Sequence, residues 1–168
     1  AAVSHALLSP SASHRWIACP PSARLTEFLA ETESSYAAEG TAAHALAEEK
    51  LNHRLGRAES PAACEDAEMD EYTTDYADFV MEQTQEIKDP MVYAEQRVDC
   101  SRFVPECYGT IDALILSDGV LHICDLKTGC GVKVDAEEND QLRIYALGAI
   151  QMFDNLYDFE TIRLSIFQ

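Results

Sequence analysis

The sequence predicts a mixed α/β fold in which helices cover a small sheet. Three observations support this prediction. Before Asp89-Pro90, apolar residues recur at spacings of three and four, which is typical of helices. After Asp89-Pro90, they alternate with polar residues or form short runs around an Asp-Gly turn, which is typical of strands. A further helical stretch and a final alternating run follow, so the predicted order is helices, three strands, a helix and a strand.

The first predicted elements are helical. Residues 7–25, LLSPSASHRWIACPPSARL, predict a Ser-capped short helix, a break at the Cys-Pro-Pro sequence and a second helix that begins near Ser22. Gly40–Leu55 is predicted to be a longer helix that stops at Gly56. One face of this helix carries residues at three- and four-residue spacing: His44, Ala47, Glu48, Leu51 and Leu55.

After a loop around Ser60-Pro61, the chain is predicted to form another long helix. Its buried stripe would consist of apolar and aromatic residues: Met69, Tyr72, Tyr76, Phe79, Val80 and Ile87. The stretch Glu65–Glu86 is rich in Asp and Glu and contains no Lys or Arg. We interpret this acidic run as the solvent-exposed face of the helix.

The region after Asp89-Pro90 contains a predicted β-hairpin, for which Asp118-Gly119 is the turn signal. The elements predicted here are a strand at Met91–Asp99, hairpin strands at Gly109–Leu116 and Val120–Lys127, a loop at 129–138, a helix at Asn139–Met152 and a strand at Thr161–Phe167. The short apolar runs and the alternation of Ile162, Leu164 and Ile166 support the strands.

The hairpin register brings two carboxylates together. If Ser117 pairs with Val120, counting back along both strands places Asp112 directly opposite Asp125. Directly opposed side chains share a face of the sheet with Cβ atoms about 4.5–5.5 Å apart. Lys127 lies on the same face, two residues beyond Asp125. Because two such carboxylates repel each other, the pattern predicts a site for a hard divalent cation such as Mg²⁺ or Mn²⁺ beside a lysine, with a surface ion pair as the alternative.

Composition narrows the class of protein. The 168 residues are 47% hydrophobic, which fits one domain with a substantial core and argues against disorder. The apolar runs are too short to cross a bilayer, and no sequence resembling a secretory signal opens the chain. The six cysteines form no C-x-x-C pair, which fits reduced thiols in a cytoplasmic protein. The net charge of −18 would repel nucleic acid.

Four motifs follow one another along the chain: G-x-x-x-H at 40–44, G-T-x-D at 109–112, D-x-K-T-G at 125–129 and Q-L-x-x-Y-A at 141–146. In order and separation they resemble the RecB-like branch of the PD-(D/E)XK nuclease superfamily. The opening S-x-S sequence, Trp16 and Cys19-Pro20 resemble the start of its CRISPR-associated and AddB-type members, and the chain is similar to a phage and prophage group of such nucleases. The resemblance covers nearly the whole chain and implies a restriction-endonuclease-like core, a small mixed sheet flanked by helices.

The resemblance also implies roles for individual residues. The catalytic residues would be Asp112, Asp125 and Lys127. The metal ligands would be His44, Asp112, Asp125 and the carbonyl oxygen of Leu126. Gln141 and Tyr145 would position the DNA strand and support the lysine, and Glu95 lies where some members carry an acidic residue.

The cysteines bear on a second cofactor. Some relatives with a Cys-Pro sequence near the start bind an iron–sulfur cluster through that cysteine and three more near the C-terminus. Cys19 fits the first position, but no cysteine follows Cys130. The residues of this chain therefore do not complete such a ligand set, and we expect no iron–sulfur cluster held by them alone.

The expected function is that of a Mg²⁺- or Mn²⁺-dependent DNA nuclease, in the first instance an exonuclease in phage recombination, replication or DNA processing. Its partners would be DNA and a recombination or replication protein, in the cytoplasm of a bacterial or phage-infected cell and away from membranes. We expect one RecB-like nuclease domain over residues 1–168, truncated at its C-terminus. Two alternatives stay open: a non-catalytic module that binds DNA ends or a partner protein, and an acidic protein that mimics DNA.

Overall fold

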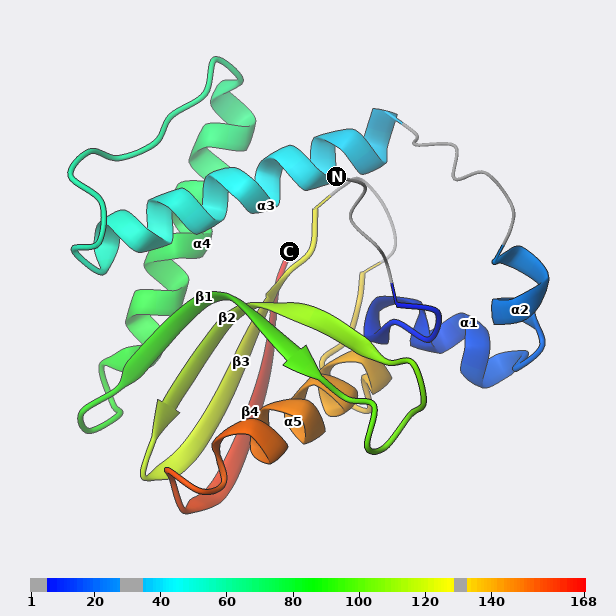
Figure 1. The fold of residues 1–168 in the computed structure, drawn as a ribbon. Helices are drawn as coiled ribbons and strands as arrows, with labels where there is room; N and C mark the ends of the chain where they lie inside the picture. The colour runs from blue at the N-terminus through cyan, green and yellow to red at the C-terminus, as the bar shows by residue number, and fades with distance from the viewer. Residues whose placement is uncertain (1–5, 28–34, 129–132) are drawn as a thin grey trace.

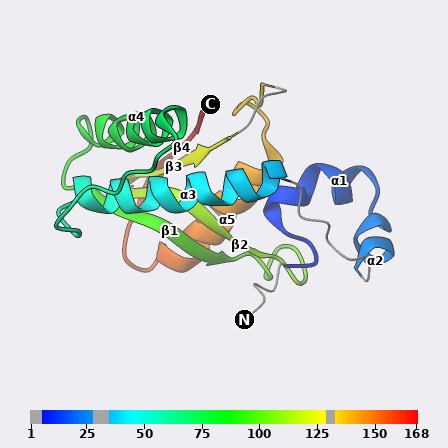
Figure 2. The ribbon, with the colours of Figure 1, turned by 90° about the horizontal axis from the view of Figure 1, so that it is seen from above.

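The computed structural model describes residues 6–27, 35–128 and 133–168. A four-stranded sheet lies between two groups of helices, with α3 and α4 packed on one face and α5 on the other (Figure 1; Figure 2). The helical elements are η1 (Pro10–Ala12, a 3-10 turn), α1 (Ser13–Ala18), α2 (Ser22–Thr26), α3 (Ser35–Arg54), α4 (Ala67–Thr84) and α5 (Asp140–Phe153). The strands are β1 (Met91–Asp99), β2 (Tyr108–Ser117), β3 (Gly119–Leu126) and β4 (Phe159–Phe167).

The strand order in the sheet is β1-β2-β3-β4. The first three strands are antiparallel neighbours, and α5 provides the crossover after which β4 pairs parallel to β3. Ser117 pairs with Val120, and the ladder runs back from there to the pair of Ala113 and Cys124. This confirms the predicted hairpin register. The left-handed backbone of Gly119 (φ 89) explains why the turn needs a glycine.

Each face of the sheet buries its own apolar core. The core under α5 includes Val98, Leu114, Leu121, Ile123, Leu142 and Ala149. The core under α3 and α4 includes Ala47, Leu51, Tyr76, Val80, Val92, Ile115 and Leu126. The central strands β2 and β3 contribute to both cores, which explains why their sequences are almost continuous apolar runs.

The predicted elements are present with shifted ends, which confirms the mixed α/β prediction. The long helix α3 begins at Ser35 rather than at Gly40. The helix α5 begins after Asn139, whose side-chain oxygen accepts a backbone hydrogen bond and caps the helix. The strand β1 has the predicted bounds, and β4 begins at Phe159 rather than at Thr161.

The prediction of a serine cap on the first helix is wrong. The 3-10 turn precedes α1, and the Ser9 side chain makes no bond to a helical N–H group. Its hydroxyl lies 3.3 Å from that of Ser11, while its carbonyl oxygen accepts a hydrogen bond from Trp16 Nε1 at 2.9 Å. Pro10 favours the tight turn because its ring sets a helical φ. The next helix begins at Ser22, as predicted.

The helix α4 carries the acidic run on its exposed side. Most of its Asp and Glu side chains are exposed, which confirms the interpretation as a solvent-exposed face. The main exception is Asp70, which pairs at 2.9 Å with the buried Lys50 of α3 and ties the two helices together. Among the helices in the described ranges, none is long and apolar enough to cross a membrane.

The loop before α5 has the predicted structure where it is described, and the described cysteines form no disulfide with one another. Residues 133–138 contain neither helix nor strand, as predicted, whereas residues 129–132 lie outside the described part of the chain. Cys130 is among the latter. The other cysteines are free thiols: Cys19, Cys64, Cys100, Cys107 and Cys124.

Candidate functional site

One position interrupts the regular alternation of β1 and β2. The ladder keeps the same register on both sides of it, so Glu95 lies opposite Asp112, but these two residues do not form a ladder pair. In β2, Ile111 and Leu114 lie in the same core although they are three residues apart, which a regular strand does not allow. Glu95 has a left-handed backbone (φ 49), which costs a residue other than glycine roughly 1–3 kcal/mol. The irregularity in the two strands therefore lies at the carboxylates of Glu95 and Asp112.

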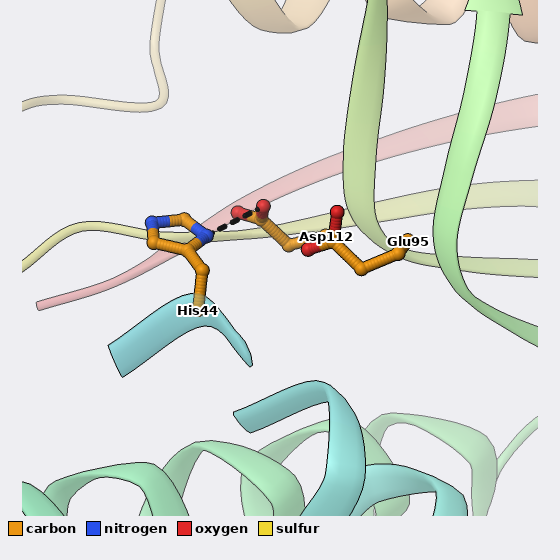
Figure 3. Close-up of side chains that lie close together, drawn as sticks. All are labelled: His44, Glu95 and Asp112. Atoms are coloured by element: carbon orange, nitrogen blue, oxygen red, sulfur yellow. Dashed lines mark hydrogen bonds and ion pairs between the residues drawn. The ribbon is translucent and has the colours of Figure 1, made fainter. Parts of the chain in front are cut away.

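His44 approaches this pair from α3 (Figure 3). Its Nδ1 lies 2.9 Å from Asp112 Oδ1, and one ligand atom from each of His44, Glu95 and Asp112 lies within 4.8 Å of the others. Packing of α3 places the imidazole here, because Ala47 and Leu51 on the same helix face are buried against the sheet. We call His44, Glu95 and Asp112 the metal-ligand group, since one nitrogen and two carboxylates are donors that divalent cations accept.

A second group, Asp125, Lys127 and Gln141, lies beside the first, and we call it the lysine group. Lys127 Nζ lies 2.8 Å from Asp125 Oδ2 and donates a hydrogen bond to Gln141 Oε1 at 2.9 Å. Gln141 Nε2 in turn donates to Asp125 Oδ1 at 3.2 Å. The three side chains form a closed ring. Apart from the lysine ion pair, the buried Asp125 Oδ2 has no hydrogen-bond partner among the described residues.

Asp112 connects the two groups. Its Oδ2 accepts a hydrogen bond from Leu126 N at 2.7 Å, one step beyond the last regular pair of β2 and β3. In the described part of the chain, Glu95 lies with His44 and Asp112, and Asp125 is bonded to Lys127 and Gln141. The role of Asp125 as a metal ligand stays a prediction. The carbonyl oxygen of Leu126 stays a prediction, because the contact described for this residue involves its N–H.

Tyr145 lies on the buried side of the lysine group. It is one turn after Gln141 on α5 and is almost completely buried. A Cβ on Gly109 would lie 2.8 Å from Tyr145 Cε1, so the glycine of the G-T-x-D motif allows α5 to approach β2 closely. Burial raises the pKa of Tyr145, so its hydroxyl keeps its proton. Its predicted contact with DNA stays a prediction.

The carboxylates of the two groups repel one another. Burial, followed by the charge of Asp112, raises the pKa of Glu95 to about 7 against the opposing effect of His44. Burial and Asp112 likewise raise the pKa of Asp125 to about 6 against the effect of Lys127. Burial lowers the pKa of His44, but its hydrogen bond to Asp112 and the surrounding carboxylates raise that pKa overall. Such shifts of several groups in one place are typical of functional sites.

The N-terminal segment forms part of the site, which the sequence analysis did not assign. A hollow of about 550 Å³ opens beside Lys127 and Gln141, and its wall includes Ser11, Ser13 and His14. Ser13 is almost completely buried. The signal for this segment was the S-x-S sequence, but neither its spacing nor its composition shows that it lies beside the lysine.

A protein-family model matches almost the whole chain. It covers residues 5–168 and is described as "Protein of unknown function (DUF2800)". No solved structure matches the chain significantly. Its activity therefore has to be inferred from the site itself.

Proposed function

This chain belongs to the DUF2800 family, and we propose that it is a DNA nuclease that depends on Mg²⁺ or Mn²⁺ and has a PD-(D/E)XK core of the RecB-like type. One observation carries the proposal. Lys127 is held by Asp125 and Gln141, and this lysine group is joined through Asp112 to a cluster of metal-ligand type. An ammonium fixed next to a metal site is suited to phosphodiester hydrolysis, because both groups can stabilise negative charge on phosphate oxygens.

The metal-ligand group fits a hard divalent cation. Ligand atoms that lie within 4.8 Å of one another can share one ion, and two of the three residues are carboxylates. The fit is also electrostatic, because Asp112 repels both Glu95 and Asp125 and a cation would replace that repulsion by attraction. Such an ion, when bound, polarises a phosphate oxygen and activates a water molecule.

Lys127 supplies a fixed positive charge, which a metal-binding protein without activity would not need. Asp125 and Gln141 hold its ammonium, so little side-chain freedom is lost when a phosphate binds. A fixed positive charge stabilises the negative charge that develops on a phosphate oxygen in the transition state. Gln141 orients both of its partners from the first turn of α5.

The first prediction is that Lys127→Ala and Asp125→Ala each abolish DNA cleavage. Removing the ammonium, or the carboxylate that holds it, removes transition-state stabilisation, so the rate should fall by at least about 10³-fold. The measurement is the degradation of end-labelled linear DNA in the presence of Mg²⁺, Mn²⁺ or a chelator. Denaturant unfolding of each variant establishes that the loss does not come from unfolding.

Lys88→Ala is the matched control, because Lys88 is an exposed lysine in the loop before β1, on another part of the surface. Its cleavage rate should equal that of the wild type. A wild-type protein that cleaves no DNA with either metal would show that the proposed function is wrong. So would a Lys127→Ala variant that cleaves DNA at the wild-type rate.

The second candidate function is that of an acidic DNA mimic. The observation that favours it is the net charge of −18 together with the exposed acidic face of α4. A DNA mimic would bind a basic protein, DNA would compete for that protein, and Lys127→Ala would leave the binding unchanged. A non-catalytic DNA-end module would instead bind DNA without cleaving it, so the cleavage assay identifies a nuclease and a DNA-binding measurement separates the other two functions.

A further inference from the structure

Lys127 lies one residue beyond the end of β3, yet both polar groups of its main chain are bonded. Its N–H donates to the carbonyl oxygen of Phe167 in β4 at 2.9 Å. Its own carbonyl oxygen accepts a hydrogen bond from Tyr72 Oη of α4 at 2.5 Å. The peptide of the lysine is therefore held from two sides by elements that contribute no side chain to the metal-ligand or lysine group.

Aromatic packing holds Tyr72 in this place. The ring centroids of Tyr72, Tyr76 and Phe79 lie 5.2, 5.8 and 5.5 Å from that of Phe167. Phe167 is also the residue whose carbonyl oxygen accepts the Lys127 N–H. The four packed rings therefore hold the Tyr72 side chain, and the ladder of β3 and β4, which pairs Leu126 with Phe167, holds the Phe167 carbonyl.

The Tyr72 hydroxyl contributes more to the position of the Lys127 peptide than to the stability of the fold. A hollow of about 310 Å³ lies beside this hydrogen bond, with Tyr72, Lys127 and Thr128 in its wall. Water in the hollow can satisfy the Lys127 carbonyl if the hydroxyl is removed, so the cost to the fold is small. A water molecule does not fix the peptide, however, whereas a hydroxyl on a packed ring does.

We propose that Tyr72 is a positioning residue for the nuclease reaction. By holding the Lys127 peptide, it keeps the ammonium where Asp125 and Gln141 receive it. Tyr72 acts through the main chain and touches none of the reacting groups. This inference rests on the proposed function and extends it to α4.

Tyr72→Phe tests the inference. The variant keeps the ring and loses one hydrogen bond, so kcat should fall about tenfold. The KM for DNA and the affinity for Mn²⁺ should both stay within about twofold of the wild-type values, because Tyr72 contacts neither ligand. A residue needed only for folding would not produce this difference between kcat and KM.

Tyr76→Phe is the matched control. Tyr76 lies one turn later on α4, packs on the same Phe167 ring and donates a hydrogen bond to the carbonyl oxygen of Cys124 at 2.9 Å. It is fully buried, so no water can replace its hydroxyl, and Tyr76→Phe should destabilise the fold more than Tyr72→Phe. Its kcat should nevertheless stay within about twofold of wild type, because Cys124 does not carry the lysine.

Amide hydrogen exchange gives a second readout that does not need activity. The Lys127 amide should exchange faster in Tyr72→Phe than in the wild type and at the wild-type rate in Tyr76→Phe. Unchanged exchange in Tyr72→Phe would overturn the inference.

The cleavage assay separates failure of the inference from failure of the proposed function. If Lys127→Ala is inactive but Tyr72→Phe has the wild-type kcat, the positioning role is wrong and the nuclease stands. A loss of kcat in Tyr76→Phe that equals or exceeds the loss in Tyr72→Phe would also overturn it, because the loss would then not depend on the bond to the lysine peptide. A wild-type protein without any cleavage would overturn both.

Discussion

Glu95 combines two features that cost stability. Its backbone has a left-handed conformation inside a strand, and its carboxylate lies beside that of Asp112 in a partly buried place. Residues are held in such states where the surrounding structure determines them, and these places are often functional sites. At the scale of the residue, Glu95 therefore has features that are typical of functional sites and do not stabilise the fold.

Glu95→Gln should stabilise the metal-free protein and reduce its stabilisation by metal. The pKa of Glu95 is raised to about 7, so its ionised form is unfavourable in the folded state. The wild type thus loses stability as the pH rises through the range from about 4.5 to 7, and the glutamine variant does not. At pH 8 the variant should be more stable by a few tenths to about 1 kcal/mol, after allowing for the partial exposure of the side chain.

Thermal unfolding in chelator at pH 5 and pH 8 measures this difference. The two proteins should unfold at similar temperatures at pH 5 and differ at pH 8. Addition of Mn²⁺ should then raise the unfolding temperature of the wild type more than that of Glu95→Gln. If Mn²⁺ raises the unfolding temperature of Glu95→Gln as much as that of the wild type, Glu95 does not belong to the metal-ligand group.

At the scale of the element, β3 is the strand on which the site depends. Asp125 and Leu126 end the strand and Lys127 follows it, and each is bonded to a different neighbour. Gln141 of α5 holds the Asp125 side chain, Asp112 of β2 accepts the Leu126 N–H, and β4 and α4 hold the Lys127 main chain. The end of β3 is therefore positioned by its neighbours on both sides of the sheet.

The contact between β3 and β4 should make the fold sensitive to acid. His122 of β3 is buried, with Nε2 2.8 Å from Ser165 Oγ of β4. Burial, followed by the charge of Arg163, lowers its pKa to about 4. The unfolded chain therefore takes up a proton on His122 near pH 6.5 while the folded protein does not, so stability is lost as the pH falls from about 6.5 to 4.

His122→Gln should remove this part of the pH dependence, because an amide can replace the hydrogen bond without titrating. Urea unfolding at pH 7 and pH 4.5 should show that the wild type loses about 1–2 kcal/mol more than the variant between the two values. An identical loss in both proteins would mean that His122 is not the group responsible.

At the scale of the whole molecule, the net charge of −18 opposes binding to DNA. Much of this charge lies on the exposed face of α4, and the site itself adds Glu95, Asp112 and Asp125. A bound divalent cation would reduce the negative potential at the site but not over the rest of the surface. The approach of DNA should therefore be limited by long-range repulsion.

This repulsion predicts an unusual salt dependence. With the metal concentration held constant, kcat/KM on DNA should rise about two- to fivefold as monovalent salt increases from about 20 to 150 mM, because added ions screen the repulsion. Proteins that bind DNA through basic surfaces show the opposite trend. A short oligonucleotide should respond less than long DNA, since it carries fewer charges. A steep fall of kcat/KM with salt would indicate a basic DNA-binding surface and contradict this account.

The features that depend on residues close together in the chain could be predicted from the sequence. The Asp118-Gly119 turn and the apolar alternation specified the hairpin register, because turn geometry and side-chain alternation act over a few residues. The same register placed Lys127 beside Asp125, and the helix of Gln141 was evident from its periodicity. The order of helices and strands could likewise be predicted, because apolar periodicity also depends on residues that are close together in the chain.

Which side chains meet across the elements depends on tertiary packing. Packing places Glu95 beside His44 and Asp112, and it brings Tyr72 of the apolar stripe to the Lys127 carbonyl. These contacts join residues far apart in the chain, and they depend on how α3 and α4 pack on the sheet. Periodicity indicates which face of a helix is buried, but the atom that each side chain reaches is set by the packing of whole elements.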